Sequence, residues 1–269
     1  NSYFIRYALT PDGRTDQWLQ GKKILLDWGN KFMLGKKTIS PISISGEKLA
    51  SPVREGSGYF PSLDNEYKNL NQYGKKNRWA AGDVANLCIG QGEITVTPLQ
   101  MAVMTSAIAN GGEIIQPRLL LAVSSLRENN QFHSIKVPRK VIKNLNLKDE
   151  TVSLLHKAML ADVDDRDGSG RGARVSGISI GGKTGTAQKQ VPTGKFSTKT
   201  GSRLFRMDHI TWFVSFAPVE SPKYVVVVMV ESGASGGKIC APIAGKVYRA
   251  IQKLEKNKNK GETKLALRL

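Results

Sequence analysis

The segment KYVVVVMVES, residues 223–232, is apolar or aromatic from Tyr224 to Val230 without interruption. A strand of this composition has no polar side, so both of its faces must be covered. Two further segments rich in β-forming residues precede it, at 173–188 and 209–219. Turns, and no crossover helix, separate the three segments. They therefore predict an antiparallel sheet.

Helical periodicity marks both ends of the chain and the stretch before the strands. Two amphipathic helices are predicted between Tyr3 and about Phe32, separated by a break at 11–13, which reads Pro-Asp-Gly. Another helix is predicted over 149–162, and a last one begins at Pro242. The side chains expected to face the core from these last two are Val152, Leu155 and Met159, then Ile243, Val247, Ile251 and Leu254.

The run TPLQMAVMTSAIANGG, residues 97–112, carries a complete set of helix signals. They are Thr97 as the N-cap, Pro98 at the first helical position, Gln100 as the capping-box partner, and Gly111-Gly112 as the stop. Met101, Met104 and Ile108 recur on one face, which predicts core packing there. Between the helices we expect an irregular connection at 36–80 and a hairpin at 117–137. This order of predicted helices and strands along the chain indicates an α+β fold, in which helices flank an antiparallel sheet.

The formal net charge of +18 favours an anionic partner, which could be a membrane surface, nucleic acid or an acidic polymer. Part of the excess lies in the last residues, 255–269, which we expect to form a basic, disordered tail. Cys88 and Cys240 are far apart and match no metal or redox spacing. No motif predicts a metal or a cofactor, and no run of eighteen apolar residues predicts a membrane span.

The most distinctive short stretch is GGKTGTAQ, residues 181–188. A phosphate-binding Walker loop requires four residues between its first glycine and the Gly-Lys pair, and that spacing is absent. The alternative is an edge strand, on which Thr184 and Thr186 share one face. Gly185 would let a ligand approach the backbone, and Lys183 would reach the site from beneath the strand. Such an edge can hold a peptide as an added strand and suits a substrate with a carboxylate.

Lys-Thr-Gly in this role is the third signature of the penicillin-recognising serine enzymes. Around it, four runs resemble, in order, the transpeptidase domain of class B penicillin-binding proteins. The runs are GDVANLCIGQGEITVTPLQMAVMTSAIANGG, GSGRGARVSGISIGGKTGTAQ, DHITWFVSFAP and ASGGKICAPIAGKV. The resemblance covers roughly residues 1–254, the expected C-terminal portion of that domain. The long polar insertion after the lysine motif is similar to that of the elongation-type, penicillin-binding protein 2-like members.

In this family the acylated serine lies in an S-x-x-K motif, and an S-x-N motif comes after it. The opening NSYF is similar to the end of that second motif and its next residues, so the resemblance identifies Asn1 as the second-motif asparagine. It thus implies a penicillin-recognising, β-lactamase-like fold that is incomplete at the N-terminus, with the nucleophile preceding this chain. The S-x-x-K matches at 45–48 and 235–238 are interpreted as chance matches in loops, since two adjacent glycines oppose a helix in the latter.

The resemblance implies a peptidoglycan D,D-transpeptidase that attacks the D-alanyl-D-alanine end of a stem peptide and that β-lactams acylate. The resemblance assigns catalytic roles to Lys183 and Asn1. Thr184, Gly185 and Thr186 would bind the substrate, and the Thr186 N–H would form half of the oxyanion hole. The implied location is the bacterial cytoplasmic membrane, reached through an anchor preceding this chain, with the domain facing the wall space. A membrane glycosyltransferase is the implied partner.

Other functions remain open at this point. A β-lactamase or penicillin sensor shares the lysine motif, although GQG followed by TPLQMA argues against both. A non-catalytic scaffold in wall synthesis fits a chain without a nucleophile. A nucleic-acid binder rests on charge alone and lacks a recognised fold signature or a pattern of stacking aromatics. We therefore expect no nucleic-acid partner.

Overall fold

The computed structural model describes residues 2–9, 18–39, 42–44, 47–49, 54–61, 80–92, 94–120, 122–126, 132–198 and 200–259. The chain divides into two compact units, Asn1–Leu147 and Lys148–Leu269, and each is described by itself. Within the described ranges, no helix is long and apolar enough to cross a membrane.

The first unit begins with the two predicted helices, α1 (Ser2–Leu9) and α2 (Trp18–Lys31), and both predictions are confirmed. Their backbones approach closely, because a Cβ added at Gly21 would lie 1.7 Å from the carbonyl oxygen of Ala8. A third helix, α3 (Ala81–Cys88), packs against both and was not predicted from the sequence. The break expected at 11–13 lies outside the described residues.

Helix α4 (Pro98–Ala109) has the predicted capping box. The Gln100 backbone N–H donates to Thr97 Oγ1 over 3.2 Å, and the Thr97 N–H donates to Gln100 Oε1 over 2.9 Å. The predicted buried stripe is wrong, because Met101, Met104 and Ile108 are only half-buried. The buried residues of the helix are Gln100, Val103, Thr105, Ala107 and Ala109 instead. The buried Gln100 amide has partners, since its Nε2 donates to the carbonyl oxygens of Lys36 and Ser57.

The strands of the first unit form three separate two-stranded antiparallel pairs. Strands β1 (Ile42–Ile44) and β2 (Glu47–Leu49) lie within the region predicted to be irregular. Strands β4 (Ala122–Leu126) and β5 (Phe132–Lys136) form the hairpin predicted at 117–137, whose expected turn at 128–130 lies outside the described residues. The third pair consists of β3 (Glu113–Ile115) and β6 (Val141–Asn144).

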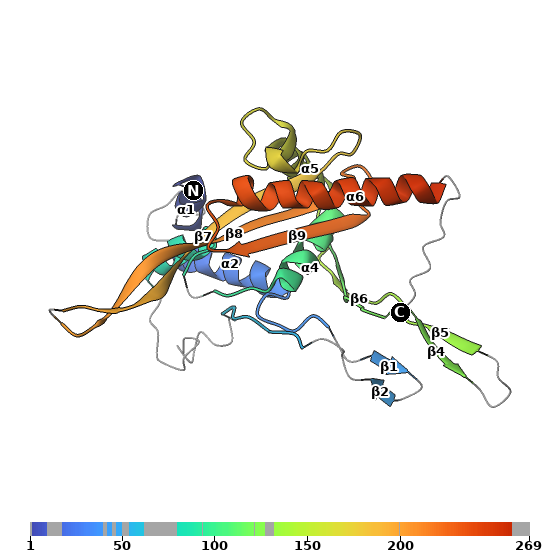
Figure 1. Cartoon of the computed structure of the whole chain (residues 1–269), viewed down its shortest axis with the longest axis horizontal. Coiled ribbons are helices and arrows are strands. Elements are labelled where there is room, and N and C mark those ends of the chain that lie inside the picture. The colour runs from blue at the N-terminus through green and yellow to red at the C-terminus, as the bar shows by residue number, and fades with distance from the viewer. Residues whose placement is uncertain are drawn as a thin grey trace. The chain divides into compact units, whose positions relative to one another are not determined.

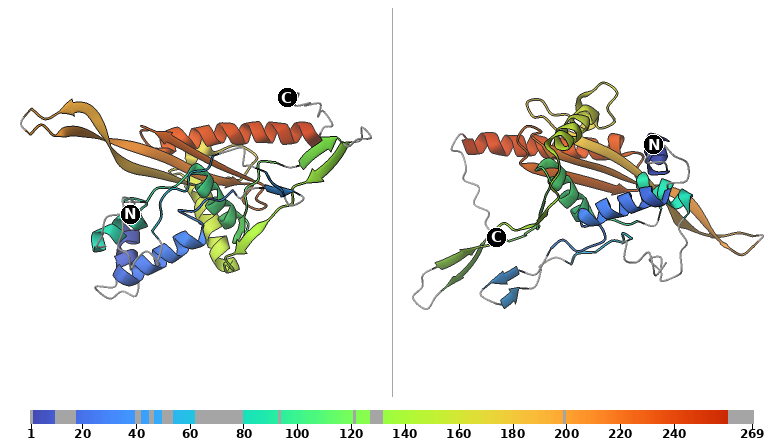
Figure 2. Two further views of the ribbon diagram at one scale, coloured as in Figure 1. Left: turned by 90° about the horizontal axis from the view of Figure 1, so that it is seen from below. Right: turned by 180° about the vertical axis from the view of Figure 1, so that it is seen from behind.

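The second unit contains the predicted antiparallel sheet, with β8 between β7 and β9. Its strands are β7 (Gly181–Phe196), β8 (Arg203–Ala217) and β9 (Tyr224–Glu231). The first strand starts later than predicted. Residues 173–180 instead contain part of a short 3-10 turn, η2 (Arg171–Ala173), and a bend at Gly177, whose φ of +79° is one that glycine adopts readily. Beyond the end of β9, β7 and β8 continue as a two-stranded ribbon (Figure 2).

Helices α5 (Asp149–Asp164) and α6 (Ala241–Asn259) complete the second unit, and α6 runs along the sheet (Figure 1). Both were predicted, but of the four core side chains assigned to α6 only Ile251 packs against the core, and it is half-buried. Ala241, Ala244 and Tyr248 are fully buried, and Tyr248 donates a hydrogen bond to Ser215 on β8. The predicted core side chains Ile243, Val247 and Leu254 are 38%, 39% and 53% exposed. Ala241, Ala244 and Tyr248 thus belong to the core and Ile251 packs against it, whereas the other three apolar side chains are exposed.

Helix α6 also crosses the domain boundary expected at residue 254, because it continues to Asn259. The remainder of the expected tail, 260–269, lies outside the described residues. The core of this unit consists of Val163, Ala173, Val175, Ile180, Phe213, Ala217, Cys240, Ala241, Ala244 and Tyr248. Strand β8 is therefore the centre of the unit, and β7 lies at its edge.

Candidate active site

The Lys-Thr-Gly-Thr sequence lies on β7, at an edge of the described sheet. Its register with β8 pairs Thr184 with Phe213 and Thr186 with Thr211. Both partners are fully buried, on the face where Cys240 lies 3.4 Å from Thr211 Oγ1. The two threonines thus share the sheet face that η3 and α6 cover, as the alternation predicted. Thr186 is exposed and Thr184 is half-buried.

Lys183 belongs to the opposite set of side chains, yet its ammonium group bends back around the strand. Its Nζ donates to the Thr184 carbonyl oxygen over 3.1 Å and lies 3.5 Å from Thr184 Oγ1. The lysine is exposed, and among the described residues its Nζ contacts no carboxylate. A positive charge is therefore available beside the threonine hydroxyl at the edge of the sheet.

Thr184 is also tied to the loop after α5. Its Oγ1 lies 2.6 Å from Ser169 Oγ, and the Ser169 hydroxyl donates to Asp162 Oδ1 over 2.6 Å. The other carboxylate oxygen, Asp162 Oδ2, is buried and has no hydrogen-bond partner in the part of the chain that the structure describes. Sequence reasoning missed both Ser169 and Asp162. The sequence signal near them was the GSG triplet at 168–170, which begins the run GSGRGARVSGISIGGKTGTAQ that resembles the family.

The face of the sheet at Gly185 and its β8 partner Trp212 is covered by a turn after β9. This is η3 (Gly236–Cys240), a π-helical turn that begins where Ser235 Oγ accepts from the Lys238 N–H. The sequence predicted a loop here, and that prediction is wrong. A Cβ at Gly236 would lie 2.2 Å from the Trp212 carbonyl oxygen and 2.8 Å from that of Gly185. The adjacent glycines therefore permit close contact between the turn and the strand.

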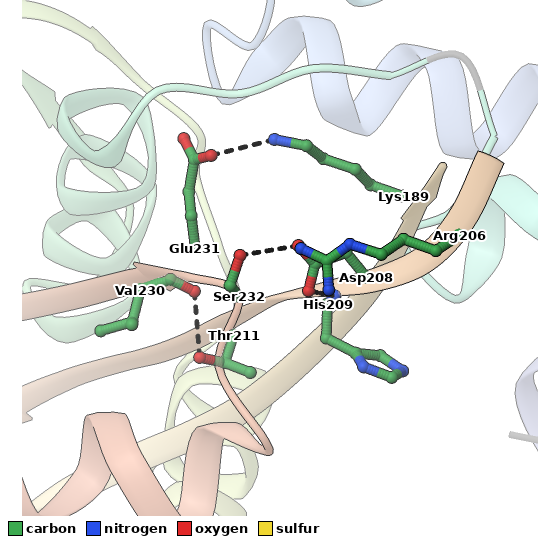
Figure 3. A network of polar contacts seen from close by, with 8 residues as sticks. All are labelled: Lys189, Arg206, Asp208, His209, Thr211, Val230, Glu231 and Ser232. Atoms are coloured by element: carbon green, nitrogen blue, oxygen red, sulfur yellow. Dashed lines mark hydrogen bonds and ion pairs between the residues drawn. The ribbon is translucent and has the colours of Figure 1, made fainter. Parts of the chain in front are cut away.

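A second polar cluster lies where β9 ends and the ribbon continues (Figure 3). The Ser232 hydroxyl donates to Asp208 Oδ2 over 2.6 Å, and the His209 N–H donates to Asp208 Oδ1 over 2.9 Å. These hydrogen bonds lower the pKa of Asp208, with a smaller contribution from Arg206. Lys189 of β7 pairs with Glu231 over 2.9 Å. The His209 ring points away from Asp208, so the two do not form an acid-base pair (Figure 3).

Two of the predicted motif positions cannot be placed. Asn1 lies outside the described residues, and so does the first residue of the S-x-x-K match at 45–48. Within the described ranges, no three His, Cys, Asp or Glu side chains gather as they would around a metal ion. The structure thus brings together Lys183, Thr184, Gly185 and Thr186, supported by Asp162 and Ser169.

The family model described as "Penicillin binding protein transpeptidase domain" matches residues 62–249. The chain belongs to this family. Peptidoglycan D,D-transpeptidase MrdA of Acinetobacter baumannii is 32% identical over 222 residues, which are 82% of this chain and 30% of that protein. Stage V sporulation protein D of Bacillus subtilis is 30% identical over 208 residues, which are 76% of this chain and 30% of that protein. The chain thus spans about a third of these relatives.

Solved structures confirm the α+β class and the penicillin-binding protein fold. Penicillin-binding protein 2B of Streptococcus pneumoniae aligns with a TM-score of 0.69 at 21% identity, covering 94% of this chain and 38% of that chain. Pseudomonas aeruginosa PBP2 aligns with a TM-score of 0.62 at 25% identity, covering 93% of this chain and 46% of that chain. The family-model match over residues 62–249 confirms the family resemblance seen in the motif runs.

Proposed function

We propose that this chain is part of a peptidoglycan D,D-transpeptidase that cross-links stem peptides. The observation that carries the proposal is the Lys-Thr-Gly-Thr sequence on a sheet edge, in a chain of the transpeptidase family. An edge strand can pair with the extended end of a peptide. The exposed Lys183 ammonium beside Thr184 Oγ1 supports this proposal, because it would attract the terminal carboxylate of D-alanyl-D-alanine.

The reaction has two acyl-transfer steps. A serine oxygen attacks the carbonyl carbon between the two D-alanines, the C–N bond breaks, and D-alanine leaves with a proton on its amine. An amine of a neighbouring stem peptide then takes the acyl group and releases the serine. Covalent catalysis divides one difficult transfer into two easier ones. In this proposal the serine lies outside the chain, Lys183 stabilises charge near it, and the Thr186 N–H helps to bind the oxyanion.

Asn1, as the second-motif asparagine, and Gly185, as the point of close backbone approach, complete the proposed site. The elongation subtype, a membrane anchor outside this chain, a position facing the wall space and a membrane glycosyltransferase partner belong to the same proposal. The +18 formal charge supports a location near anionic lipid head groups or wall polymers.

Labelling of the full-length protein with a fluorescent penicillin tests the proposed activity. We expect one covalent adduct that persists through denaturation and that unlabelled penicillin prevents. Steady hydrolysis of the β-lactam would indicate a β-lactamase instead, and absence of labelling in folded protein would contradict the proposal.

Lys183→Ala and Thr186→Val test the site assignment. We expect Lys183→Ala to slow acylation by about 100-fold or more, the usual loss when a group that stabilises transition-state charge is removed. Thr186→Val keeps the backbone N–H and removes only a hydroxyl that would hold the substrate carboxylate, so we expect a loss of about tenfold. Both side chains are exposed, so the melting temperature should hardly change. Gln190→Ala, at an exposed position farther along β7, is the matched control and should acylate normally. Unchanged acylation in both site variants would refute the assignment.

A further inference from the structure

The hydrogen bonds behind the lysine motif have a defined direction. A carboxylate oxygen can only accept, so the single hydroxyl hydrogen of Ser169 goes to Asp162 Oδ1. The 2.6 Å contact between Ser169 and Thr184 must then use the hydroxyl hydrogen of Thr184. Thr184 Oγ1 consequently presents lone pairs to its remaining neighbours, and the Lys183 ammonium lies 3.5 Å away as a donor. The Thr184 hydroxyl can therefore donate to a bound carboxylate only if it gives up its hydrogen bond to Ser169.

The loop that holds Ser169 is fixed by contacts that only glycines permit. A Cβ at Gly168 would lie 2.3 Å from the Asp162 carbonyl oxygen, and a Cβ at Gly170 would lie 2.7 Å from Asp162 Oδ2. The Gly170 N–H donates to the Asp162 carbonyl oxygen over 2.8 Å. On the other side, a Cβ at Gly237 would lie 2.3 Å from the Ser169 carbonyl oxygen. Ser169 is thus held between the end of α5 and the η3 turn, with its hydroxyl between Asp162 and Thr184.

We propose that Asp162 and Ser169 are positioning residues that set the affinity of the site for the substrate carboxylate. They hold the Thr184 hydrogen toward Ser169, so a carboxylate that uses this hydroxyl must first break that hydrogen bond, whereas the Lys183 ammonium remains exposed. Loosening this restraint releases the Thr184 hydroxyl as an additional donor. The inference rests on the proposed function, because it concerns the same carboxylate and the same strand.

A purely structural role for the two residues makes a different prediction. If Asp162 and Ser169 only joined the loop to β7, their loss would loosen the strand and slow acylation by every ligand. A positioning role acts on one group of the ligand, so its effect disappears when that group carries no charge. The ratio of the acylation rate constant for an acid to that for its ester therefore distinguishes the two roles.

The experiment measures the second-order rate constant for acylation of the full-length protein by benzylpenicillin and by its methyl ester. For Ser169→Ala we expect the acid-to-ester ratio to rise about tenfold, as for one added hydrogen bond to a charged group. Asp162→Asn should act in the same direction, because its amide can donate to Ser169 and reverse the chain of donors. In a Thr184→Val background, Ser169→Ala should leave the ratio unchanged, which makes the pair a double-mutant cycle.

An unchanged or lower ratio in Ser169→Ala and Asp162→Asn would overturn the proposal. So would a rise in the ratio that persists in the Thr184→Val background. If Ser169→Ala does not fold, Asp162→Asn, which preserves shape, gives the answer alone. Wild-type protein that neither ligand acylates would refute the proposed function itself, whereas acylation with an unaltered ratio would refute only the role of Asp162 and Ser169.

Discussion

Asp208 is a residue whose ionisation is tied directly to the fold. The Ser232 hydroxyl and the His209 N–H hold its carboxylate, and its side chain is only 14% exposed. Its pKa is lowered from the ordinary 3.8 by these two hydrogen bonds, with Arg206 adding to the effect. A depressed folded-state pKa means that stability is present above the unfolded pKa and is lost as the pH falls through the folded one. The window for this residue therefore lies below about pH 4.

We expect Asp208→Asn to lower the melting temperature at pH 7 and to reduce its fall between about pH 4 and about pH 2, because the variant has no carboxylate to protonate there. Thermal melts at a series of pH values provide the measurement. Ser232→Ala, which removes only the strongest donor, should give an intermediate pH dependence. Parallel curves for wild type and Asp208→Asn over the whole range would show that the carboxylate does not stabilise the fold.

Single residues also show how far the candidate site could be predicted from the sequence. The motif at 183–186 is contiguous and alternates along a strand, so local rules were enough to predict its placement and the shared face of Thr184 and Thr186. Ser169 and Asp162 could not be predicted in the same way. They reach Thr184 only because the loop after α5 folds back on β7, and a contact across that fold leaves no local pattern.

At the scale of elements, the sequence predicted correctly those features that depend on contacts between residues close together in the chain. The α4 capping box lies within four consecutive residues, 97–100, and was predicted correctly. The buried face of α6 depends on the sheet beneath it, where Tyr248 meets Ser215, and it was assigned wrongly. The apolar pattern of Ile243, Val247 and Leu254 is real, but tertiary packing selected the alanine-lined face instead.

The junction between η3 and the sheet provides a stability prediction at this scale. Gly236→Ala should lower the free energy of unfolding by about 1–3 kcal/mol, as for overpacking against backbone that cannot move far. Its Cβ would lie 2.2 Å from the Trp212 carbonyl oxygen. Gly82→Ala in α3 is the control, since nothing lies within 4 Å of the added Cβ and alanine favours helix. Denaturant melts showing equal losses in both variants would contradict the close contact of η3 with β8.

At the scale of the whole molecule, the described residues leave apolar surface on α6. Ile243, Val247 and Leu254 recur at helical spacing and are 38%, 39% and 53% exposed. Strand β9, apolar along its length, is the other edge of the described sheet. An uncovered apolar face beside an open strand edge favours association.

We therefore expect the chain 1–269, prepared by itself, to self-associate through α6 at micromolar concentrations, because burial of these side chains removes apolar surface from water. Sedimentation velocity over a range of concentrations measures the association. Ile243→Gln combined with Val247→Gln should shift the chain toward monomer without altering its net charge. Ala250→Gln, at an exposed position of the same helix, is the matched control and should associate like the wild type. A chain that stays monomeric at every concentration, or a double variant that associates as strongly as the control, would show that this face of α6 does not drive association.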